Sequence, residues 1–130
     1  MSNTNKYLVR CPSYYTEKYE PKYRKFSFEL DHFQKFACEG IDNNENVFVA
    51  VATGSGKTVP AEYAIAKAIT ENKKVVYISP IKALSNQKYK DFSEDIDDIG
   101  IMTGDNKVNP GASLVIMTAE IFRNSLYRSK

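Results

Sequence analysis

Cysteine, histidine and long apolar runs are scarce in this sequence, and each scarcity excludes a class of protein. The two cysteines, Cys11 and Cys38, cannot form a disulfide framework or a four-cysteine zinc site, so we expect free thiols in a reducing compartment. The single histidine, His32, argues against most zinc hydrolases and histidine-base mechanisms. The longest apolar run, Val47–Ala52, has six residues, whereas a membrane-spanning helix needs about 20. Residues 1–10 also lack the apolar core of a signal peptide. We therefore expect a soluble, intracellular protein without membrane association.

Charge is distributed unevenly along the 130 residues, although 18 basic and 16 acidic side chains leave a net charge of only +2. Residues 1–25 carry six basic and two acidic side chains, a net +4, and five of the nine tyrosines. They follow no helical or strand period, so we expect an irregular N-terminal arm ahead of one domain over residues 26–130. Tyrosines can stack on bases and cations can meet phosphates, which favours RNA contact by the arm. The alternative is a packed or frayed terminus.

From residue 26 onward, apolar periodicity alternates between the patterns of helices and of strands. Helices are expected at about 31–41, immediately after the glycine-rich segment 53–58, at 83–92 and at 119–128, and strands at 47–52, 74–79, 99–103 and 114–118. The second helix has an apolar stripe, and Lys67 lies off it. The acidic stretch 91–98 is typical of a solvated loop. Alternating strands and helices predict an α/β fold with a mostly parallel sheet and helices on both faces.

The glycine-rich segment Thr53–Thr58 is the most informative stretch of the chain. Two glycines allow the backbone to curl so that successive N–H groups point at phosphate oxygens, and the following helix contributes its positive end. Lys57 is placed to bridge the β- and γ-phosphates of a nucleotide, and the Thr58 hydroxyl is placed to ligate Mg²⁺. Val51 stands where the general pattern begins with glycine. The alternative is a glycine turn that merely closes a sheet connection.

Further motifs follow one another along the chain in a fixed order. They are Phe28–Gln34, Val51–Thr58 with its helix Val59–Ile65, Ser79–Tyr89, Met102–Asp105 and Val115–Arg123. In this order, the segment Phe26–Arg128 resembles the first half of the first RecA-like domain of superfamily 2 helicases. It is most similar to the DExH-box RNA helicases of the superkiller type, which feed RNA to the exosome. One departure is Ala119, where threonine is more usual.

The resemblance implies an incomplete P-loop NTPase fold and a role for each matching residue. Phe28 would stack on the adenine of ATP, and Gln34 would hydrogen-bond to the edge of that base. The triphosphate and Mg²⁺ would be held by Thr53, Gly54, Ser55, Gly56, Lys57 and Thr58, with Lys57 and Thr58 as the candidate catalytic residues. The RNA backbone would be contacted by Pro80, Lys82, Ala83, Thr103, Gly104, Thr118 and Glu120.

Each of these residues also has a structural explanation. Phe28 could belong to the core, and Gln34 could be an ordinary surface residue of its helix. Lys82 could be a solvated helix charge, and Glu120 could be favoured only by its place in the first turn of a helix. The binding role rests on the physics of the fold, because loops at the carboxyl ends of parallel strands form the binding crevice of an open α/β sheet. Backbone N–H groups, hydroxyls and a lysine bind phosphate there without reading base sequence.

The implied function is that of an ATP-dependent RNA helicase, which couples ATP binding and hydrolysis to translocation on RNA and unwinding. Its substrate would be single-stranded RNA or a duplex with a 3′ overhang, and its partners would be exosome-type RNA decay factors. The sequence contains no Asp-Glu-x-His motif and no second RecA-like domain, so we expect an ATP-binding half-domain that is inactive alone. The alternatives are a non-catalytic truncated homologue that binds nucleotide or RNA, and a DNA helicase of the same superfamily. The motifs at 79–89 and 102–105 disfavour a small-molecule kinase.

Overall fold

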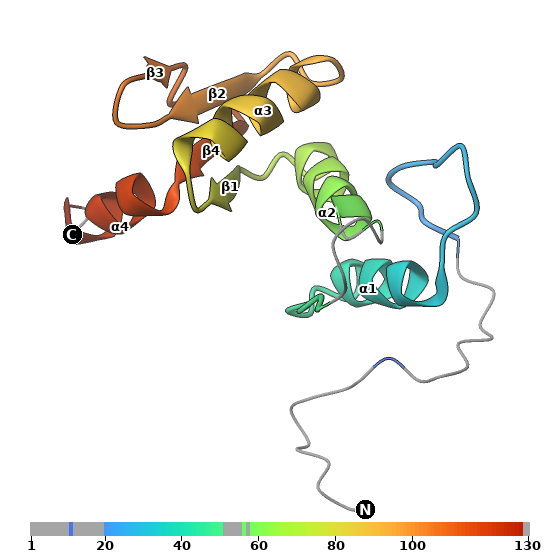
Figure 1. The fold of residues 1–130 in the computed structure, drawn as a ribbon. Helices are drawn as coiled ribbons and strands as arrows, with labels where there is room; N and C mark the ends of the chain where they lie inside the picture. Colours follow the sequence, from blue (N-terminus) through green and yellow to red (C-terminus); the bar gives the residue numbers. More distant parts are fainter. Residues whose placement is uncertain (1–10, 12–19, 51–55, 57, 129–130) are drawn as a thin grey trace, which may run out of the picture. The chain divides into compact units, whose positions relative to one another are not determined.

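The computed structural model describes residues 11, 20–50, 56 and 58–128 (Figure 1). The predicted arm lies largely outside these residues, as do four residues of the predicted phosphate loop: Thr53, Gly54, Ser55 and Lys57. The chain divides into two compact units, residues 1–67 and residues 68–130.

In the first unit, helix α1 (His32–Asp42) packs against helix α2 (Thr58–Thr70), whose residues up to Lys67 belong to this unit. Their shared core contains Leu30 and Cys38 from the side of α1, and Val59 and Tyr63 from α2. The Tyr63 hydroxyl donates a hydrogen bond of 2.6 Å to the Asp42 carboxylate, which ties the end of α1 to the middle of α2. The helix predicted at 31–41 and the helix after the glycine-rich segment are both confirmed.

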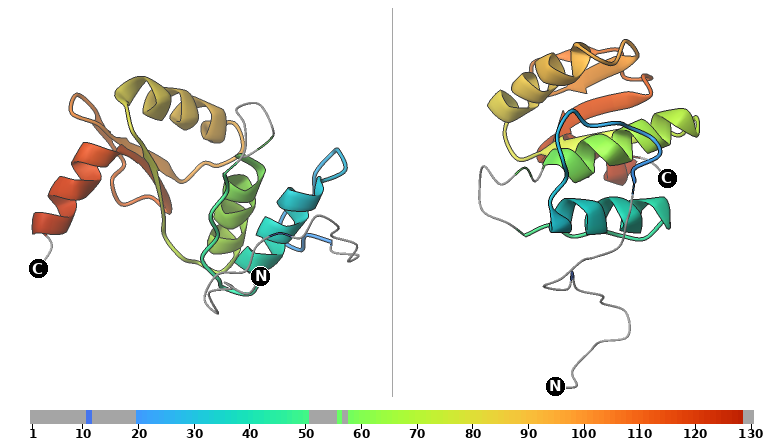
Figure 2. Two further views of the ribbon diagram at one scale, coloured as in Figure 1. Left: turned by 60° about the horizontal axis from the view of Figure 1, so that its bottom comes forward. Right: turned by 90° about the vertical axis from the view of Figure 1, so that its right-hand side faces the viewer.

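The second unit is built on a sheet of four strands, β1 (Val75–Ser79), β2 (Ile99–Met102), β3 (Lys107–Val108) and β4 (Leu114–Thr118). Their order is β1-β4-β2-β3; β1, β4 and β2 are parallel, and β3 runs antiparallel to β2. Helix α3 (Lys82–Ser93) lies across this sheet (Figure 2), and helix α4 (Ala119–Arg128) follows β4 directly. The α/β class and the three predicted strands of this unit are confirmed.

The two helices of this unit contact opposite faces of the sheet. Tyr77 of β1 makes an edge-to-face ring contact with Phe92 of α3, with ring centroids 5.4 Å apart. Tyr77 pairs with Ile116 in register, and side chains alternate between faces along a strand. Val115, the neighbour of Ile116, therefore faces the other way, where Phe122 of α4 packs against its cluster. This arrangement confirms the expectation of helices on both faces.

One local expectation is wrong, and two local features of the structure were not predicted. Residues 47–50 form no strand, and Phe48 is 89% exposed. The strand predicted at 47–52 is therefore wrong for its described part. The physical reason is that none of the described strands pairs with these residues to satisfy their backbone N–H and C=O groups. Strand β3 was not predicted. Lys67, which lies off the apolar stripe of α2, is nevertheless buried, because its ammonium donates to the Ile41 carbonyl, at 2.9 Å, and to the Asn44 side chain.

Candidate functional site

Gln34, the predicted adenine-reading residue, is joined to the predicted phosphate loop. Its side-chain Nε2 donates a hydrogen bond of 3.1 Å to the carbonyl oxygen of Gly56, 22 residues away in the sequence. Its Oε1 accepts a hydrogen bond of 2.8 Å from the backbone N–H of Asp31, the residue that precedes α1. Gln34 is only 4% exposed. It is therefore not an ordinary surface residue, and no local pattern in the sequence predicted its hydrogen bond to the loop.

Gly56 occupies a position that only glycine fits comfortably. Its φ of +76° lies in the left-handed region, and a Cβ built there would fall 2.5 Å from Gln34 Nε2. Helix α2 begins two residues later at Thr58, which is half-buried, and the N–H of Val59 donates to the Gly56 carbonyl at 3.2 Å. The positive end of α2 therefore adjoins the loop, as an anion-binding loop requires. A close-fitting glycine, a helix N-terminus and a threonine at its first position fit a nucleotide phosphate with its Mg²⁺.

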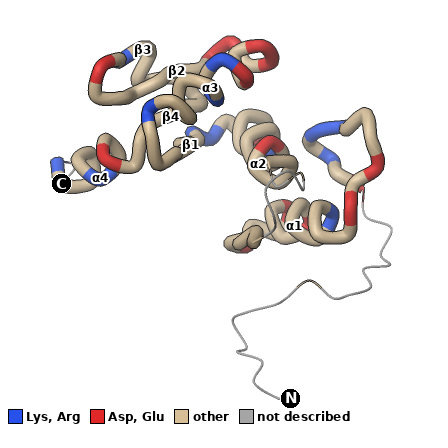
Figure 3. The backbone as a smooth tube through the Cα atoms, viewed as in Figure 1, with Lys and Arg blue, Asp and Glu red and all other residues tan. Residues whose placement is uncertain are grey.

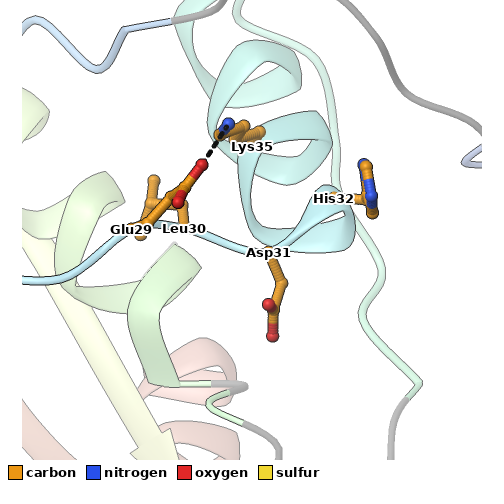
Figure 4. Close-up of a pocket in the computed structure, with 5 residues that line it drawn as sticks. All are labelled: Glu29, Leu30, Asp31, His32 and Lys35. Carbon is orange, nitrogen blue, oxygen red and sulfur yellow. Dashed lines mark ion pairs between the residues drawn. The ribbon is translucent and has the colours of Figure 1, made fainter.

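Phe28 lies at the surface of the first unit rather than in its core. Its side chain is 53% exposed, and its ring lies 5.6 Å from that of Phe26, which in turn carries the Arg24 guanidinium 5.6 Å above its centre. The next residues, Glu29 to His32, line a pocket together with Lys35 (Figure 4). Lys35 and Glu29 form an ion pair of 3.9 Å there. An exposed aromatic ring is thus available beside the start of α1.

In the second unit, the carboxyl ends of the parallel strands bring the predicted nucleic-acid-binding residues to one edge of the sheet. Ser79, which ends β1, is in register with Thr118, which ends β4. The predicted residues follow β1 (Pro80, Lys82, Ala83), follow β2 (Thr103, Gly104), or end and follow β4 (Thr118, Glu120). All are exposed except the two threonines, Thr103 at 6% and Thr118 at 9%. The N-cap residue of α3, Ile81, makes no capping hydrogen bond with its side chain at this edge.

The sequence profile of the DEAD/DEAH box helicases matches residues 31–129. The chain belongs to this helicase family. It is 48% identical to the DExH-box ATP-dependent RNA helicase DExH9 of Arabidopsis thaliana over 122 residues. This alignment covers 94% of the chain and 12% of that protein. It is 52% identical over 105 residues to the human exosome RNA helicase MTR4, covering 81% of the chain and 10% of that protein.

A third relative is the antiviral helicase SKI2 of Saccharomyces cerevisiae, with 55% identity over 107 residues, covering 81% of the chain and 8% of that protein. The chain therefore spans about a tenth of the length of these three curated relatives. The predicted resemblance to DExH-box RNA helicases is confirmed. None of the helices among the described residues has both the length and the apolar character needed to cross a membrane.

Two buried serines support the helicase motif at residues 79–89, and sequence reasoning gave them no role. The hydroxyls of Ser79 and Ser85 are hydrogen-bonded to each other, and both also lie 3.3 Å from the carbonyl oxygen of Ile81. Ser85 is fully buried and Ser79 is 5% exposed. The pair fixes the path of the chain from β1 into α3, the segment that carries Pro80 and Lys82. The only sequence signal was two small polar residues flanking a strand-to-helix turn.

Thr103 organises the turn that follows β2. Its Oγ1 accepts hydrogen bonds from the backbone N–H groups of Asp105, at 3.3 Å, and Asn106, at 3.1 Å. Its own N–H donates to the Asn106 carbonyl at 2.8 Å. The Asp105 carboxylate forms an ion pair with the Lys82 ammonium at the start of α3. The structure thus links the helicase motifs at 79–89 and 102–105.

The acidic stretch at residues 91–98 begins in the last turn of α3 rather than in a loop, and it then leads to the amino end of β2 (Figure 3). One of its members, Asp98, is not simply solvated, because its carboxylate accepts hydrogen bonds from the Ser113 hydroxyl, at 2.6 Å, and the Ser113 N–H, at 3.0 Å. These bonds, with a weaker one from Asn109, lower the pKa of Asp98. In the first unit, burial raises the pKa of the Cys38 thiol to about 12, with the nearby Asp42 charge adding to the effect. Cys38 therefore serves as a packed core residue, because its protonated thiol is a poor nucleophile.

Proposed function

We propose that this chain is the ATP-binding part of an ATP-dependent RNA helicase, whose ATP binding and hydrolysis drive translocation on RNA and unwinding. The observation that carries the proposal is the hydrogen bond from Gln34 to Gly56. It joins the residue expected to read adenine with the loop expected to hold phosphates. The names of the relatives in Arabidopsis and human describe RNA helicases, which supports RNA rather than DNA as the polymer.

Within this proposal, the nucleotide lies on the first unit. Phe28 offers an exposed ring for stacking, and Gln34 offers the edge of a carboxamide held in the first turn of α1. The triphosphate is held by the loop residues Thr53, Gly54, Ser55, Gly56 and Lys57, and Thr58 ligates the Mg²⁺. When bound, ATP supplies the phosphoanhydride whose hydrolysis releases the free energy for movement. The role of Lys57 is to neutralise charge on the β- and γ-phosphates.

RNA lies, by the same proposal, along the carboxyl edge of the sheet in the second unit. Lys82 and the N–H groups of the first turn of α3 bind a backbone phosphate, and Gly104 extends the track. Glu120 lies on the same track, where its carboxylate accepts a hydrogen bond from a ribose hydroxyl rather than contacting a phosphate. The basic arm at residues 1–25 adds further phosphate contacts. Such contacts read the backbone and not the bases, so we propose sequence-independent binding of single strands or of 3′ overhangs.

The domain division and the cellular role complete the proposal. Residues 1–25 form the arm, and residues 26–130 form part of a RecA-like ATP-binding domain. The relatives named for the exosome and for antiviral activity favour an intracellular role in RNA decay, with exosome-type decay factors as partners.

The test is equilibrium dialysis of the chain against ATP with Mg²⁺, using Lys57→Ala and the matched control Lys90→Ala. Lys90 is an exposed lysine near the end of α3, so its removal changes the net charge equally without touching the loop. We expect Lys57→Ala to lose binding and Lys90→Ala to retain it. Equal ATP affinity of the parent chain and both variants would show that the loop does not form part of the ATP site. Competition with GTP then tests the adenine preference assigned to Phe28 and Gln34.

A further inference from the structure

One predicted RNA-binding cation of this chain is already paired with an anion of the chain itself. The Lys82 ammonium and the Asp105 carboxylate form an ion pair, although both side chains are well exposed, at 52% and 66%. Lys82 is the first residue of α3, and Asp105 lies in the turn after β2. The pair thus sits on the edge where the proposed RNA track runs.

The turn after β2 holds Asp105 in place through its backbone. Thr103, which is 6% exposed, binds the N–H groups of Asp105 and Asn106 through its hydroxyl and the Asn106 carbonyl through its own N–H. These bonds involve the Asp105 backbone and not its carboxylate. Replacing the carboxylate by an amide of the same shape therefore leaves the turn intact.

We propose that Asp105 competes with RNA phosphate for the Lys82 ammonium and so lowers the affinity of this edge for single-stranded RNA. The inference rests on the proposed function, because it takes Lys82 as a phosphate contact. A phosphate that approaches Lys82 must displace the carboxylate or accept its repulsion. An exposed ion pair of this kind is worth up to about 1 kcal/mol, which corresponds to about a two- to fivefold loss of RNA affinity.

The competition also affects the response of RNA binding to salt. A lysine that neutralises one phosphate of a single strand contributes about 0.7 to the slope of log affinity against log salt, through counterion release. When phosphate displaces the Asp105 carboxylate from Lys82, that carboxylate binds a salt cation from solution. This uptake cancels part of the counterion release from the RNA. Removing the carboxylate should therefore steepen the slope by up to about 0.7.

The test compares Asp105→Asn with Asp97→Asn in binding to a fluorescent oligouridylate, measured by anisotropy at low and at physiological salt. Asp97 is an exposed carboxylate that precedes β2, at the other end of that strand, so its removal changes the net charge equally. The rate at which a soluble acylating reagent modifies Lys82 is measured in parallel by mass spectrometry. It reports the ion pair without RNA, because a carboxylate in contact with the ammonium restricts the access of the reagent to that nitrogen. Both substitutions are repeated in a Lys82→Ala background.

We expect Asp105→Asn to speed acylation of Lys82, to tighten oligouridylate binding about two- to fivefold and to steepen its salt slope. Asp97→Asn should do none of these, and Asp105→Asn should have no effect on RNA binding in the Lys82→Ala background. Unchanged or weaker binding by Asp105→Asn, while the parent chain binds RNA, would overturn the competition and leave the proposed function standing. An equal gain in oligouridylate affinity in Asp97→Asn would also overturn the proposal, because the change in net charge alone would then explain the effect of Asp105→Asn. Failure of the parent and all variants to bind the oligouridylate would overturn both the RNA track and this inference.

Discussion

The contact between Gln34 and Gly56 makes a quantitative prediction for Gly56→Ala. The new Cβ would lie 2.5 Å from Gln34 Nε2 at a φ of +76°. The left-handed conformation costs a non-glycine residue about 1–2 kcal/mol. Displacing Gln34 also sacrifices its hydrogen bond to the Gly56 carbonyl, a loss of about 0.5–1.5 kcal/mol. We therefore expect Gly56→Ala to lower the free energy of unfolding by about 2–3 kcal/mol in total.

Urea denaturation without nucleotide measures this loss, and Gly111→Ala is the matched control. A Cβ at Gly111 meets nothing within 4 Å, and its φ is not in the left-handed region, so this substitution should be close to neutral. In a Gln34→Ala background the new Cβ meets no carboxamide and no hydrogen bond is left to lose. Gly56→Ala should then retain only the cost of the left-handed conformation, about 1–2 kcal/mol. Equal stability of Gly56→Ala and Gly111→Ala would refute the proposed contact.

Three further predictions follow from buried or hydrogen-bonded groups. Ser85→Ala removes the hydrogen bond between the two hydroxyls and leaves Ser79 only its long bond to the Ile81 carbonyl, so urea denaturation should show a loss of about 0.5–1.5 kcal/mol; a loss near zero would contradict the serine pair. The pKa of Asp98 is lowered by its bonds from Ser113, so its contribution to stability is present above about pH 4 and disappears as the pH falls through its native pKa. An NMR titration that places this pKa at or above that of an unfolded chain would contradict this. Cys38 should react with iodoacetamide at pH 8 only after unfolding, whereas the exposed Cys11 should react in the folded chain. Peptide mass spectrometry that finds rapid modification at Cys38 of the folded chain would show that it is not buried.

Local patterns in the sequence sufficed for most elements of this fold. The helices at α1, α3 and α4 and the strands β1, β2 and β4 each carry their own apolar period, so they could be predicted without knowledge of their neighbours. Strand β3 has two residues and exists only through its pairing with β2, where Val108 faces Ile101. An apolar run such as 47–50 likewise becomes a strand only where another strand pairs with it.

The contacts of the candidate site were harder to predict than its residues. The order of motifs placed Gln34 and Gly56 in the same nucleotide site, but their hydrogen bond joins residues 22 positions apart. The burial of Lys67 depends on the Ile41 carbonyl and on Asn44, which the fold brings to it from the end of α1. The pairing of Lys82 with Asp105 likewise depends on the parallel arrangement of β1 and β2. The periodicity of a single segment does not predict contacts between residues that are far apart in the sequence.

The most direct test of the ATP site is a proton–nitrogen correlation spectrum of the chain during titration with ATP and Mg²⁺. The account predicts that the Gln34 side-chain amide and the Gly56 backbone amide shift together, while the Gly111 amide of the second unit does not. GTP should perturb the Gln34 amide less than ATP, because the carboxamide is expected to read adenine. Unchanged Gln34 and Gly56 signals at saturating ATP would contradict the proposal that this chain carries the ATP site of a helicase.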